Sequence, residues 1–120
     1  MTGQYDILVA DDEDAILEFI IQVLVDEGYA VRAVRDGASA LFEVQMAPPG
    51  LVLLDNAMPV MTGAETLTRI RELGYYDLPI IVMSANAHAR ELLGLGATAF
   101  LPKPFTLDHL LSLVSYYLPP

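Results

Sequence analysis

The sequence predicts an α/β domain built on a doubly wound, five-stranded parallel sheet. Short apolar runs alternate with segments of helical periodicity, in a β-α order repeated five times along 120 residues. Each run is three to five residues long and is bounded by Asp, Gly, Pro or Ser. Continuous apolar runs of this length are typical of strands buried on both faces, as in a parallel sheet covered by helices on both sides. We therefore expect one domain over residues 1–120.

The strands are predicted from these runs. The three strongest are Ile7–Ala10, Leu51–Leu54 and Ile80–Met83, and two weaker ones lie at Ala30–Val34 and Ala99–Leu101. Their length favours strands over helices, which need longer periodic segments. We expect all five to be buried.

The helices are predicted from capping and terminating residues. The first is capped by Asp14 and ended by Gly28, and its predicted core face comprises Ile16, Phe19, Ile20, Val23 and Leu24. The second spans Gly37–Met46 before Pro48-Pro49, and the third spans Gly63–Leu73 before Gly74. The fourth is short, Ala87–Leu93, and is closed by Gly94 and Gly96. The fifth spans Thr106–Leu118, before Pro119-Pro120, which is a tail or the start of a linker.

Composition excludes several function classes. The chain carries 16 acidic and 6 basic residues, a net charge of -10, and no cysteine. Such a negative charge argues against binding nucleic acid or anionic membranes. The lack of cysteine excludes a disulfide scaffold and thiol catalysis and fits a cytoplasmic location. No apolar run approaches the roughly 20 residues that a membrane span needs, and Met1–Asp6 lacks the basic region of a signal peptide.

Polar residues follow four of the predicted strands. Asp11-Asp12-Glu13 follows the first, Asp55 the third, Ser84 the fourth, and Lys103, the only lysine in the chain, the fifth. Because functional crevices of such sheets lie beyond the carboxyl ends of the strands, we expect these side chains to converge. Each signal alone has an ordinary structural explanation, as a helix cap, a turn residue or a surface charge. Their joint placement favours a site.

The residue types in this cluster indicate phosphoryl chemistry. Adjacent buried carboxylates repel one another and require a cation. Hard oxygen ligands without cysteine point to Mg²⁺, with Mn²⁺ as the alternative. The ammonium of Lys103 and the hydroxyl of Ser84 suit a dianionic phosphoryl group. Asp55 is then the candidate nucleophile that forms an acyl phosphate.

The motifs carry a family resemblance. They are Asp11-Asp12-Glu13, Asp55-x-x-Met58-Pro59-x-Met61-x-Gly63, Ser84-Ala85, Gly96-Ala97 and Lys103-Pro104-Phe105, in this order. The chain resembles, over essentially its whole length, the receiver domain of bacterial two-component response regulators. The resemblance implies a flavodoxin-like topology and a signalling switch rather than a turnover enzyme, although the domain would catalyse its own phosphorylation and dephosphorylation.

The resemblance also implies individual roles. Asp55 would accept a phosphoryl group from a sensor histidine kinase or a histidine phosphotransfer protein. Asp12 would bind Mg²⁺ directly and Asp11 mainly through water, with the side chain of Asp55 and the backbone carbonyl of Ala57 completing the protein ligands. Lys103, before a cis peptide bond, would pair with Asp55 at rest and with the phosphoryl oxygens afterwards. Glu13 is given no ligand role.

Two further residues would form the switch. Ser84 would move to hydrogen-bond the phosphoryl group, and Phe100 would turn inward when it does. Phe100 has no phenol hydroxyl, so the switch would depend on packing alone. Ala57 and Asn86 occupy positions that tune the lifetime of the phosphorylated form, and we expect hydrolysis that is not unusually fast.

Besides Phe100 in place of Tyr, two departures from the family pattern stand out. Thr62 stands where many members have Asp, in a turn that needs Gly63 for its backbone shape. The segment from Ser84 to Lys103 is shorter than usual by roughly one helical turn. The fourth helix contributes to the output face in this family, so the downstream partner is not predicted.

The first helix offers a candidate docking strip. Leu17, Ile21 and Val25 recur every four residues, to one side of the predicted core face. One interpretation is a wide buried face. The other is an exposed apolar strip that meets the helical bundle of the kinase, which the resemblance favours. Under the second interpretation, replacing Ile21 with Glu would weaken phosphotransfer without unfolding the domain.

The residues also bear on two rival functions. Aspartate-nucleophile phosphatases resemble each other in having a second Asp two residues after the nucleophile, and Ala57 occupies that place, which argues against this class. A phosphorylation-independent interaction domain is the other alternative. The complete set of Asp11, Asp12, Asp55, Ser84 and Lys103 argues against it.

Overall fold

The computed structural model of the chain describes residues 6–85 and 89–120. The described residues form one sheet of β1 (Asp6–Ala10), β2 (Ala30–Val34), β3 (Leu51–Asp55), β4 (Ile80–Ser84) and β5 (Ala99–Pro102). The strands lie in the order β2-β1-β3-β4-β5, and every neighbouring pair is parallel. The predicted doubly wound parallel sheet is confirmed.

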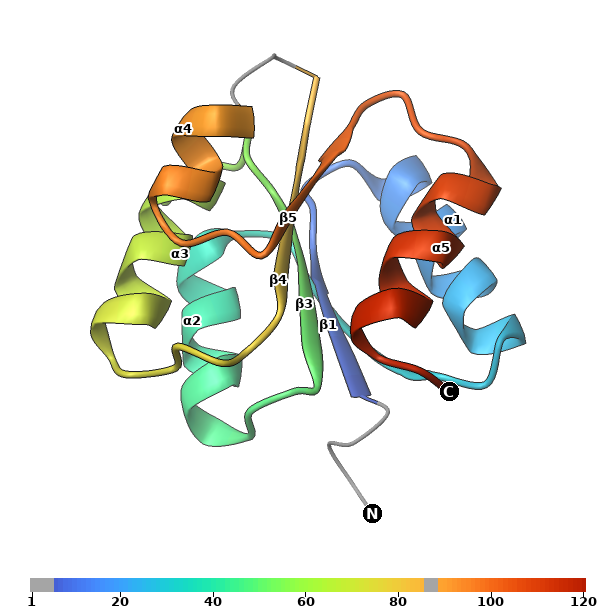
Figure 1. Ribbon diagram of the computed structural model, residues 1–120, viewed down its shortest axis with the longest axis horizontal. Helices are drawn as coiled ribbons and strands as arrows, with labels where there is room; N and C mark the ends of the chain where they lie inside the picture. Colours follow the sequence, from blue (N-terminus) through green and yellow to red (C-terminus); the bar gives the residue numbers. More distant parts are fainter. Residues whose placement is uncertain (1–5, 86–88) are drawn as a thin grey trace.

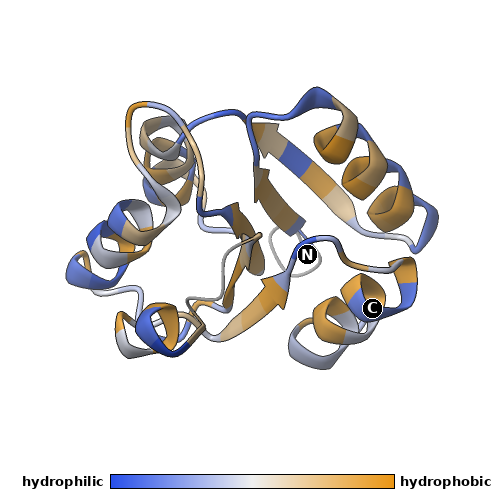
Figure 2. Cartoon of the chain, turned by 90° about the horizontal axis from the view of Figure 1, so that it is seen from above, coloured by the Kyte–Doolittle hydropathy of each residue, from blue (hydrophilic) through white to orange (hydrophobic). Residues whose placement is uncertain are grey.

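Helices cover both faces of this sheet. They are α1 (Asp14–Asp26), α2 (Gly37–Met46), α3 (Gly63–Glu72), α4 (Ala89–Gly94) and α5 (Leu107–Tyr117). Figure 1 shows α1 and α5 on one face and α2, α3 and α4 on the other. Seen from above, largely hydrophobic strands lie between the two helical layers (Figure 2). None of the described helices has the length and apolar character needed to cross a bilayer.

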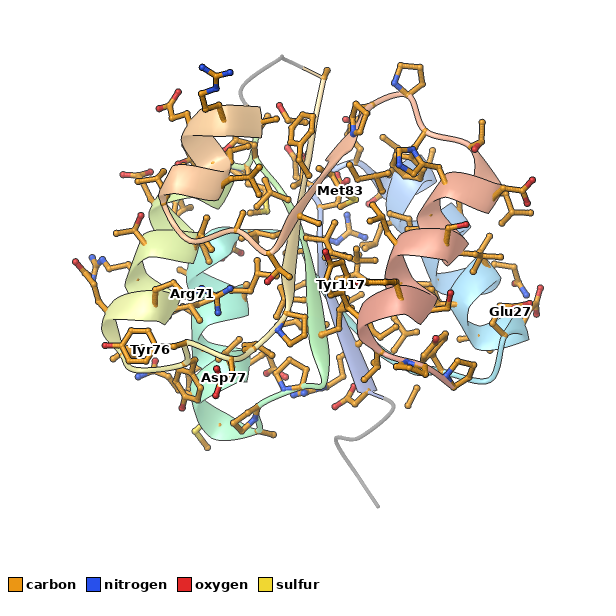
Figure 3. The ribbon with its side chains drawn as sticks, viewed as in Figure 1. Glu27, Arg71, Tyr76, Asp77, Met83 and Tyr117 are labelled. Carbon is orange, nitrogen blue, oxygen red and sulfur yellow. The ribbon has the colours of Figure 1, made fainter. Side chains whose placement is uncertain are left out.

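The core consists of two apolar clusters, one on each face of the sheet. Successive side chains of β1 alternate between them: Ile7 and Val9 pack toward α1 and α5, and Leu8 and Ala10 toward the other helices. Figure 3 shows Met83 and Tyr117 on the α1–α5 side. The expectation that all five strands are buried is wrong for β2 and β5, whose residues are mostly half-buried or exposed because each forms an edge of the sheet.

The first helix packs differently from its prediction. Leu17 is 5% exposed and belongs to the core with Ile20 and Leu24, whereas Phe19 is 45% exposed. The prediction that Leu17, Ile21 and Val25 form an exposed strip is therefore wrong. Leu17 is buried, Ile21 is partly buried against the core, and only Val25 is well exposed. Leu17, Ile20 and Leu24 follow the i, i+3, i+7 spacing of one helical stripe. Almost every residue nearby is apolar, so spacing alone does not identify that stripe.

The start of α1 differs from its prediction, and the predicted start of α4 lies outside the described residues. Glu13, rather than Asp14, is the N-cap residue of α1, and its side chain makes no capping hydrogen bond. For α4, the expected first residue Ala87 lies outside the described residues, as do Asn86 and His88. The described part of α4 has 6 residues.

Arg71 connects the ends of three segments on the α3 side. Its Nε donates to the carbonyl of Gly96 at 2.9 Å, and its Nη1 donates to those of Tyr75 and Leu78 at 2.6 and 2.7 Å. Its Nη2 donates to Thr98 Oγ1 at 3.3 Å. Burial lowers the pKa of the Arg71 guanidinium. Arg71 lies near Tyr76 and Asp77 of the loop after α3 (Figure 3), and it fixes where α4 ends and β5 begins.

The packing of α1 gives a stability prediction. We expect Leu17→Ala to lower the free energy of unfolding by about 2–5 kcal/mol, because it leaves a cavity in the core. Phe19→Ala should cost less than about 1 kcal/mol, because much of that side chain already contacts water. Urea unfolding of both variants measures the difference. Equal losses would contradict the assignment of Leu17 to the core face.

Candidate functional site

The predicted polar residues meet at the carboxyl edge of the sheet. Asp11 directly follows β1, Asp55 and Ser84 are the last residues of β3 and β4, and Lys103 directly follows β5. The register aligns these strand ends, with Ala10 opposite Leu54, Asp55 opposite Met83, and Ser84 opposite Pro102. The parallel sheet therefore gathers residues that lie far apart in the sequence.

Lys103 is the centre of the cluster. Its Nζ lies 2.8 Å from Asp55 Oδ1, 3.1 Å from Asp11 Oδ2 and 3.8 Å from Glu13 Oε1. The side chains of Lys103, Asp55 and Asp11 are 11%, 3% and 0% exposed. The backbone N–H of Lys103 donates to the carbonyl of Ser84 at 2.9 Å, and the Lys103-Pro104 peptide bond is cis, as expected. The structure thus contains a buried ion cluster with two carboxylates around one ammonium.

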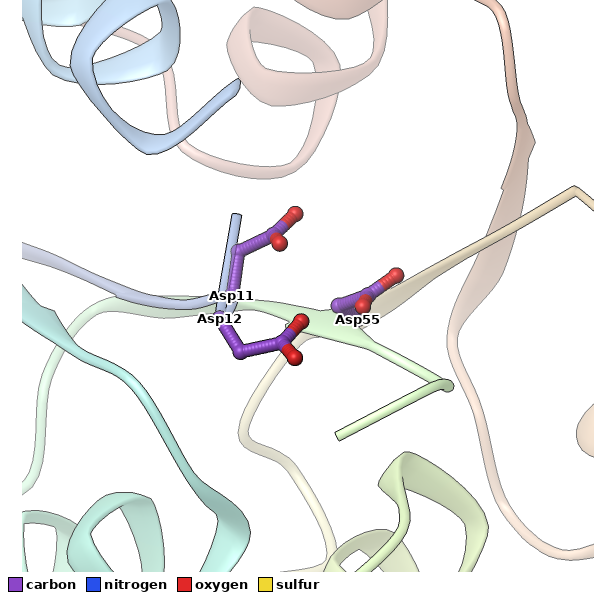
Figure 4. Close-up of side chains that lie close together, drawn as sticks. All are labelled: Asp11, Asp12 and Asp55. Carbon is purple, nitrogen blue, oxygen red and sulfur yellow. The ribbon is translucent and has the colours of Figure 1, made fainter. Parts of the chain in front are cut away.

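A third carboxylate completes the acidic group. Oxygens of Asp11, Asp12 and Asp55 all lie within 4.8 Å of one another, and Figure 4 shows the side chains of Asp11 and Asp12 extending toward Asp55. This separation is close to the roughly 4 Å between opposite oxygen ligands of one Mg²⁺. Three carboxylates and one ammonium leave two negative charges uncompensated. Both the donor atoms and the charge fit a hard divalent cation such as Mg²⁺ or Mn²⁺.

Burial and neighbouring charges perturb both partners of the central ion pair. Burial raises the pKa of Asp55, the hydrogen bond from Lys103 lowers it in part, and the charges of Asp11 and Asp12 raise it further. Burial alone would lower the pKa of Lys103, but its hydrogen bonds and charge interactions with Asp55 and Asp11 raise it overall. Lys103 therefore stays an ammonium, and the carboxylates carry more negative charge than this one ammonium neutralises.

The loop after β3 is held against Asp55 by close packing. A Cβ atom on Gly63 would lie 2.5 Å from the carbonyl oxygen of Asp55 and 2.7 Å from Cα of Asn56. Gly63 has no left-handed φ, so its absent side chain, rather than an unusual backbone shape, is what the turn requires. The expected reason for this glycine is therefore corrected. Any side chain here would push α3 away from the site.

Thr62 is the N-cap residue of α3. Its Oγ1 accepts from the N–H of Glu65 at 3.1 Å, and Glu65 Oε1 accepts from the N–H of Thr62 at 3.0 Å. This reciprocal capping box satisfies two N–H groups of the helix start. Asn56 Oδ1 accepts from the N–H of Ala64 at 3.0 Å. The residue after Asp55 is thus bonded directly to α3.

Val60 has an unusual backbone conformation that no sequence motif predicts. It is the one non-glycine residue with positive φ in the described part of the chain, at 71°, and it is 85% exposed. The N–H of Met61 donates across it to the carbonyl of Pro59 at 2.8 Å. A β-branched residue in this conformation costs about 1–3 kcal/mol. The surrounding loop therefore holds a strained turn next to the site.

A small cavity opens at Asp55. Its volume is about 100 Å³, and Asp55, Ala57, Ser84, Lys103 and Glu13 contribute to its lining. Ser84 is buried at the end of β4, and Ala57 is exposed. Glu13, for which the sequence predicts no role, lines the cavity and lies 3.8 Å from Lys103.

Phe100 lies on β5, away from the cavity lining. It is half-buried against the core cluster on the α2–α4 side, and it is the register partner of Val82. Ser84 follows Val82 by two residues, so the two side chains lie on the same face of β4. Phe100 and Ser84 are thus on one face of the sheet.

A larger apolar groove lies beside the cavity. Its volume is about 410 Å³, and Ile16 and Phe19 of α1 line one side while Pro104 and Phe105 line another. Lys103 and Ala85 also contribute to the lining. The exposed aromatic ring of Phe19 therefore forms part of a concave surface that reaches the site.

Comparisons with known proteins agree with this geometry. The family described as "Response regulator receiver domain" matches residues 7–115. The curated relatives include "Response regulator MprA" of Mycobacterium sp. (strain KMS), 39% identical over 109 residues, and its counterpart in Mycobacterium avium (strain 104), 38% identical over the same length. The match covers 88% of this chain and 47% of each relative. The chain thus spans about half the length of these relatives, so the single-domain organisation of residues 1–120 stays a prediction.

Solved structures give the same result. The receiver domain of the Francisella response regulator 1452 superposes with a TM-score of 0.90 and 29% identity, covering 94% of this chain and 95% of that one. The chemotaxis response regulator CheY4 of Vibrio cholerae superposes with a TM-score of 0.88 and 32% identity, covering 94% and 98%. The predicted flavodoxin-like topology is confirmed.

The raised pKa of Asp55 gives a pH prediction. The pKa of this carboxyl is higher in the folded than in the unfolded state. The folded protein therefore becomes less stable as the pH rises from 3.8, the ordinary pKa of the group, through its raised pKa. Asn cannot ionise, and its amide oxygen can still accept from Lys103. We therefore expect Asp55→Asn to melt higher than wild type at neutral pH in EDTA, by an amount that shrinks toward pH 4.

Mg²⁺ should reduce this difference in melting temperature. A bound cation stabilises the folded state, and wild type should bind it more tightly than Asp55→Asn because it has one more carboxylate. Melting temperatures with and without Mg²⁺ measure both effects. Glu72→Gln, at an exposed position near the end of α3, controls for the loss of one negative charge. A neutral-pH wild type that melts above Asp55→Asn in EDTA would contradict the prediction.

Proposed function

This chain belongs to the response regulator receiver domain family, and from that premise we propose that Asp55 accepts a phosphoryl group from a phosphohistidine of a sensor kinase or phosphotransfer protein. One observation carries the proposal. Asp55 ends a central strand at 2.8 Å from the only lysine of the chain and within 4.8 Å of two further carboxylates. Receiver domains are signalling domains and not classical enzymes, so phosphorylation here would switch the conformation of the protein and not turn over a substrate.

The proposed reaction is a displacement at phosphorus. A carboxylate oxygen of Asp55 forms a bond to phosphorus, the P–N bond of the phosphohistidine breaks, and the imidazole leaves with the bonding electron pair. Lys103, which pairs with Asp55 at rest, transfers its hydrogen bonds to the phosphoryl oxygens. Ser84, in the lining of the same cavity, donates its hydroxyl hydrogen to another of those oxygens. Together these groups also make the domain catalyse its own phosphorylation and dephosphorylation.

The metal site is proposed at the same edge. Asp11, Asp12, Asp55 and the backbone carbonyl of Ala57 would hold Mg²⁺, or Mn²⁺, with water filling the remaining positions. The ion, when bound, neutralises charge on the carboxylates and on the transferred phosphoryl group. The hard oxygen donors and the two uncompensated negative charges support this assignment.

The proposed switch uses Ser84 and Phe100. When Ser84 moves toward the phosphoryl group, it vacates space on the face of the sheet that it shares with Phe100, and the ring turns inward. The half-buried ring and the register between Val82 and Phe100 support this coupling. A phenylalanine makes no hydrogen bond after turning, so packing alone stabilises the inward position. The downstream partner and any output of a longer protein are left open.

The docking site on the first helix is revised. We place it at the groove of Ile16, Phe19, Pro104 and Phe105 instead of the strip of Leu17, Ile21 and Val25. The groove is apolar, concave and lined by Lys103, so a helix bound there would lie next to the acceptor site. The kinase or phosphotransfer protein would bring its phosphohistidine to Asp55 from this side.

Phosphorylation itself gives the first prediction for this proposal. Incubation with acetyl phosphate and Mg²⁺ should add the mass of one phosphoryl group to the intact protein. The adduct should be absent from Asp55→Asn and present in Asp77→Asn, which serves as the matched control. An adduct that persists in Asp55→Asn would place the acceptor elsewhere. If neither acetyl phosphate nor phosphoramidate gives an adduct, the phosphorylation-independent interaction domain is the better explanation.

The groove gives the second prediction. Phe19→Ala should raise the KM for a phosphorylated phosphotransfer domain by about 5- to 10-fold, because an exposed aromatic anchor is lost. The rate with acetyl phosphate, which needs no docking surface, should not change. Val25→Ala, exposed on the same helix but outside the groove, is the control. If Val25→Ala raises the KM as much as Phe19→Ala does, the groove is the wrong surface.

A further inference from the structure

Glu13 has a distinctive place at the site. Among the described residues that line the cavity, it is the one charged group besides Asp55 and Lys103. Its Oε1 lies 3.8 Å from Lys103 Nζ, and its side chain is 62% exposed, against 11% for Lys103 and 3% for Asp55. The Glu13 carboxylate therefore lies on the solvent side of the ion cluster, at the mouth of the cavity.

The backbone around Glu13 fixes this position. Its N–H donates to Asp11 Oδ1 at 3.0 Å, and its carbonyl accepts from the N–H of Leu17 at 3.0 Å. Although Glu13 is the N-cap residue of α1, its side chain makes no capping hydrogen bond. The carboxylate is thus not used to start the helix. It adds negative charge on the path to an acceptor that already has excess negative charge.

We propose that the charge of Glu13 selects among phosphoryl donors, disfavouring dianionic acyl phosphates relative to donors that carry a protonated nitrogen on phosphorus. This inference rests on the proposed phosphorylation of Asp55. Acetyl phosphate is a dianion at neutral pH. In its reaction the P–O bond breaks and acetate leaves as an anion, so both donor and leaving group are repelled by Glu13.

Nitrogen donors meet a smaller barrier. Phosphoramidate is a monoanion at neutral pH, because its nitrogen is protonated. In its reaction Asp55 forms the new O–P bond, the P–N bond breaks, and ammonia leaves with the electron pair and the protons that it already carries. Phosphohistidine is also a P–N donor, and protonation of its other ring nitrogen, the one not bonded to phosphorus, lowers its net negative charge in the same way. A cavity mouth with one carboxylate therefore favours P–N donors over small metabolic acyl phosphates.

Coulomb's law sets the size of the effect. One unit charge a few ångströms away in a water-like dielectric changes a rate by about two- to fivefold. The effect on a dianion exceeds that on a monoanion, and it falls with salt because the Debye length is about 8 Å at 0.15 M. Both donors use the same Lys103 and the same metal site. The ratio of their rates therefore isolates the contribution of Glu13.

The experiment measures phosphorylation rates of the full chain with acetyl phosphate and with phosphoramidate, at Mg²⁺ concentrations that saturate each variant. We expect Glu13→Gln to raise the acetyl phosphate rate about two- to fivefold at low salt and the phosphoramidate rate by less. Glu13→Lys should move the ratio further in the same direction, and added salt should shrink both changes. Glu72→Gln, which removes an exposed acid on α3, is the matched control and should leave the ratio unchanged.

Two outcomes overturn the inference alone. If both rates change by the same factor, Glu13 acts on the reaction as a whole and does not select donors. If Glu72→Gln shifts the ratio as much as Glu13→Gln does, net charge rather than position is responsible. A wild type that forms no adduct with either donor overturns the proposed function as well, which distinguishes the two failures.

Discussion

The buried ion cluster of Lys103, Asp55 and Asp11 is the constraint on which the rest of the structure depends. Three strands must end at the same level for these groups to meet, and the register of β1, β3, β4 and β5 achieves this. Burying carboxylates is unfavourable unless a cation compensates them, and one ammonium compensates only part of the charge. The core packing therefore supports a site that is short of positive charge at rest. That shortage makes the site receptive to a divalent cation.

The loops around the cluster serve the same constraint. Gly63 lets α3 approach the backbone of Asp55, the Thr62–Glu65 capping box fixes where α3 begins, and Asn56 bonds the two together. The strained conformation of Val60 shows that this loop is held by its surroundings rather than by local preference. On the far side of the molecule, Arg71 fixes the end of α4 and the start of β5. These contacts hold the elements on either side of the cavity that Ala57, Ser84 and Glu13 line.

Sequence reasoning succeeded where the signal was local and periodic. The apolar runs predicted the strands, and the rule that crevices lie beyond strand ends brought Asp11, Asp55, Ser84 and Lys103 together. It failed on α1, where apolar residues occupy nearly the whole helix and only tertiary packing decides that Leu17 is buried and Phe19 is not. It gave a wrong reason for Gly63, because a close approach between distant backbones leaves no trace in spacing. The hydrogen bonds of Arg71 and the position of the Glu13 carboxylate depend on side-chain directions, which no sequence motif predicts.

The burial of Lys103 has a practical consequence for the chemistry of this protein. The chain has a single lysine, and that lysine is 11% exposed within the ion cluster. Acylating reagents react with neutral amines, and the raised pKa of Lys103 keeps its amine protonated. Amine-directed dyes and cross-linkers will therefore react slowly with Lys103 while the ion cluster is intact. Any label that does reach Lys103 reports that the cluster has opened, so the protein carries a built-in chemical probe of its own site.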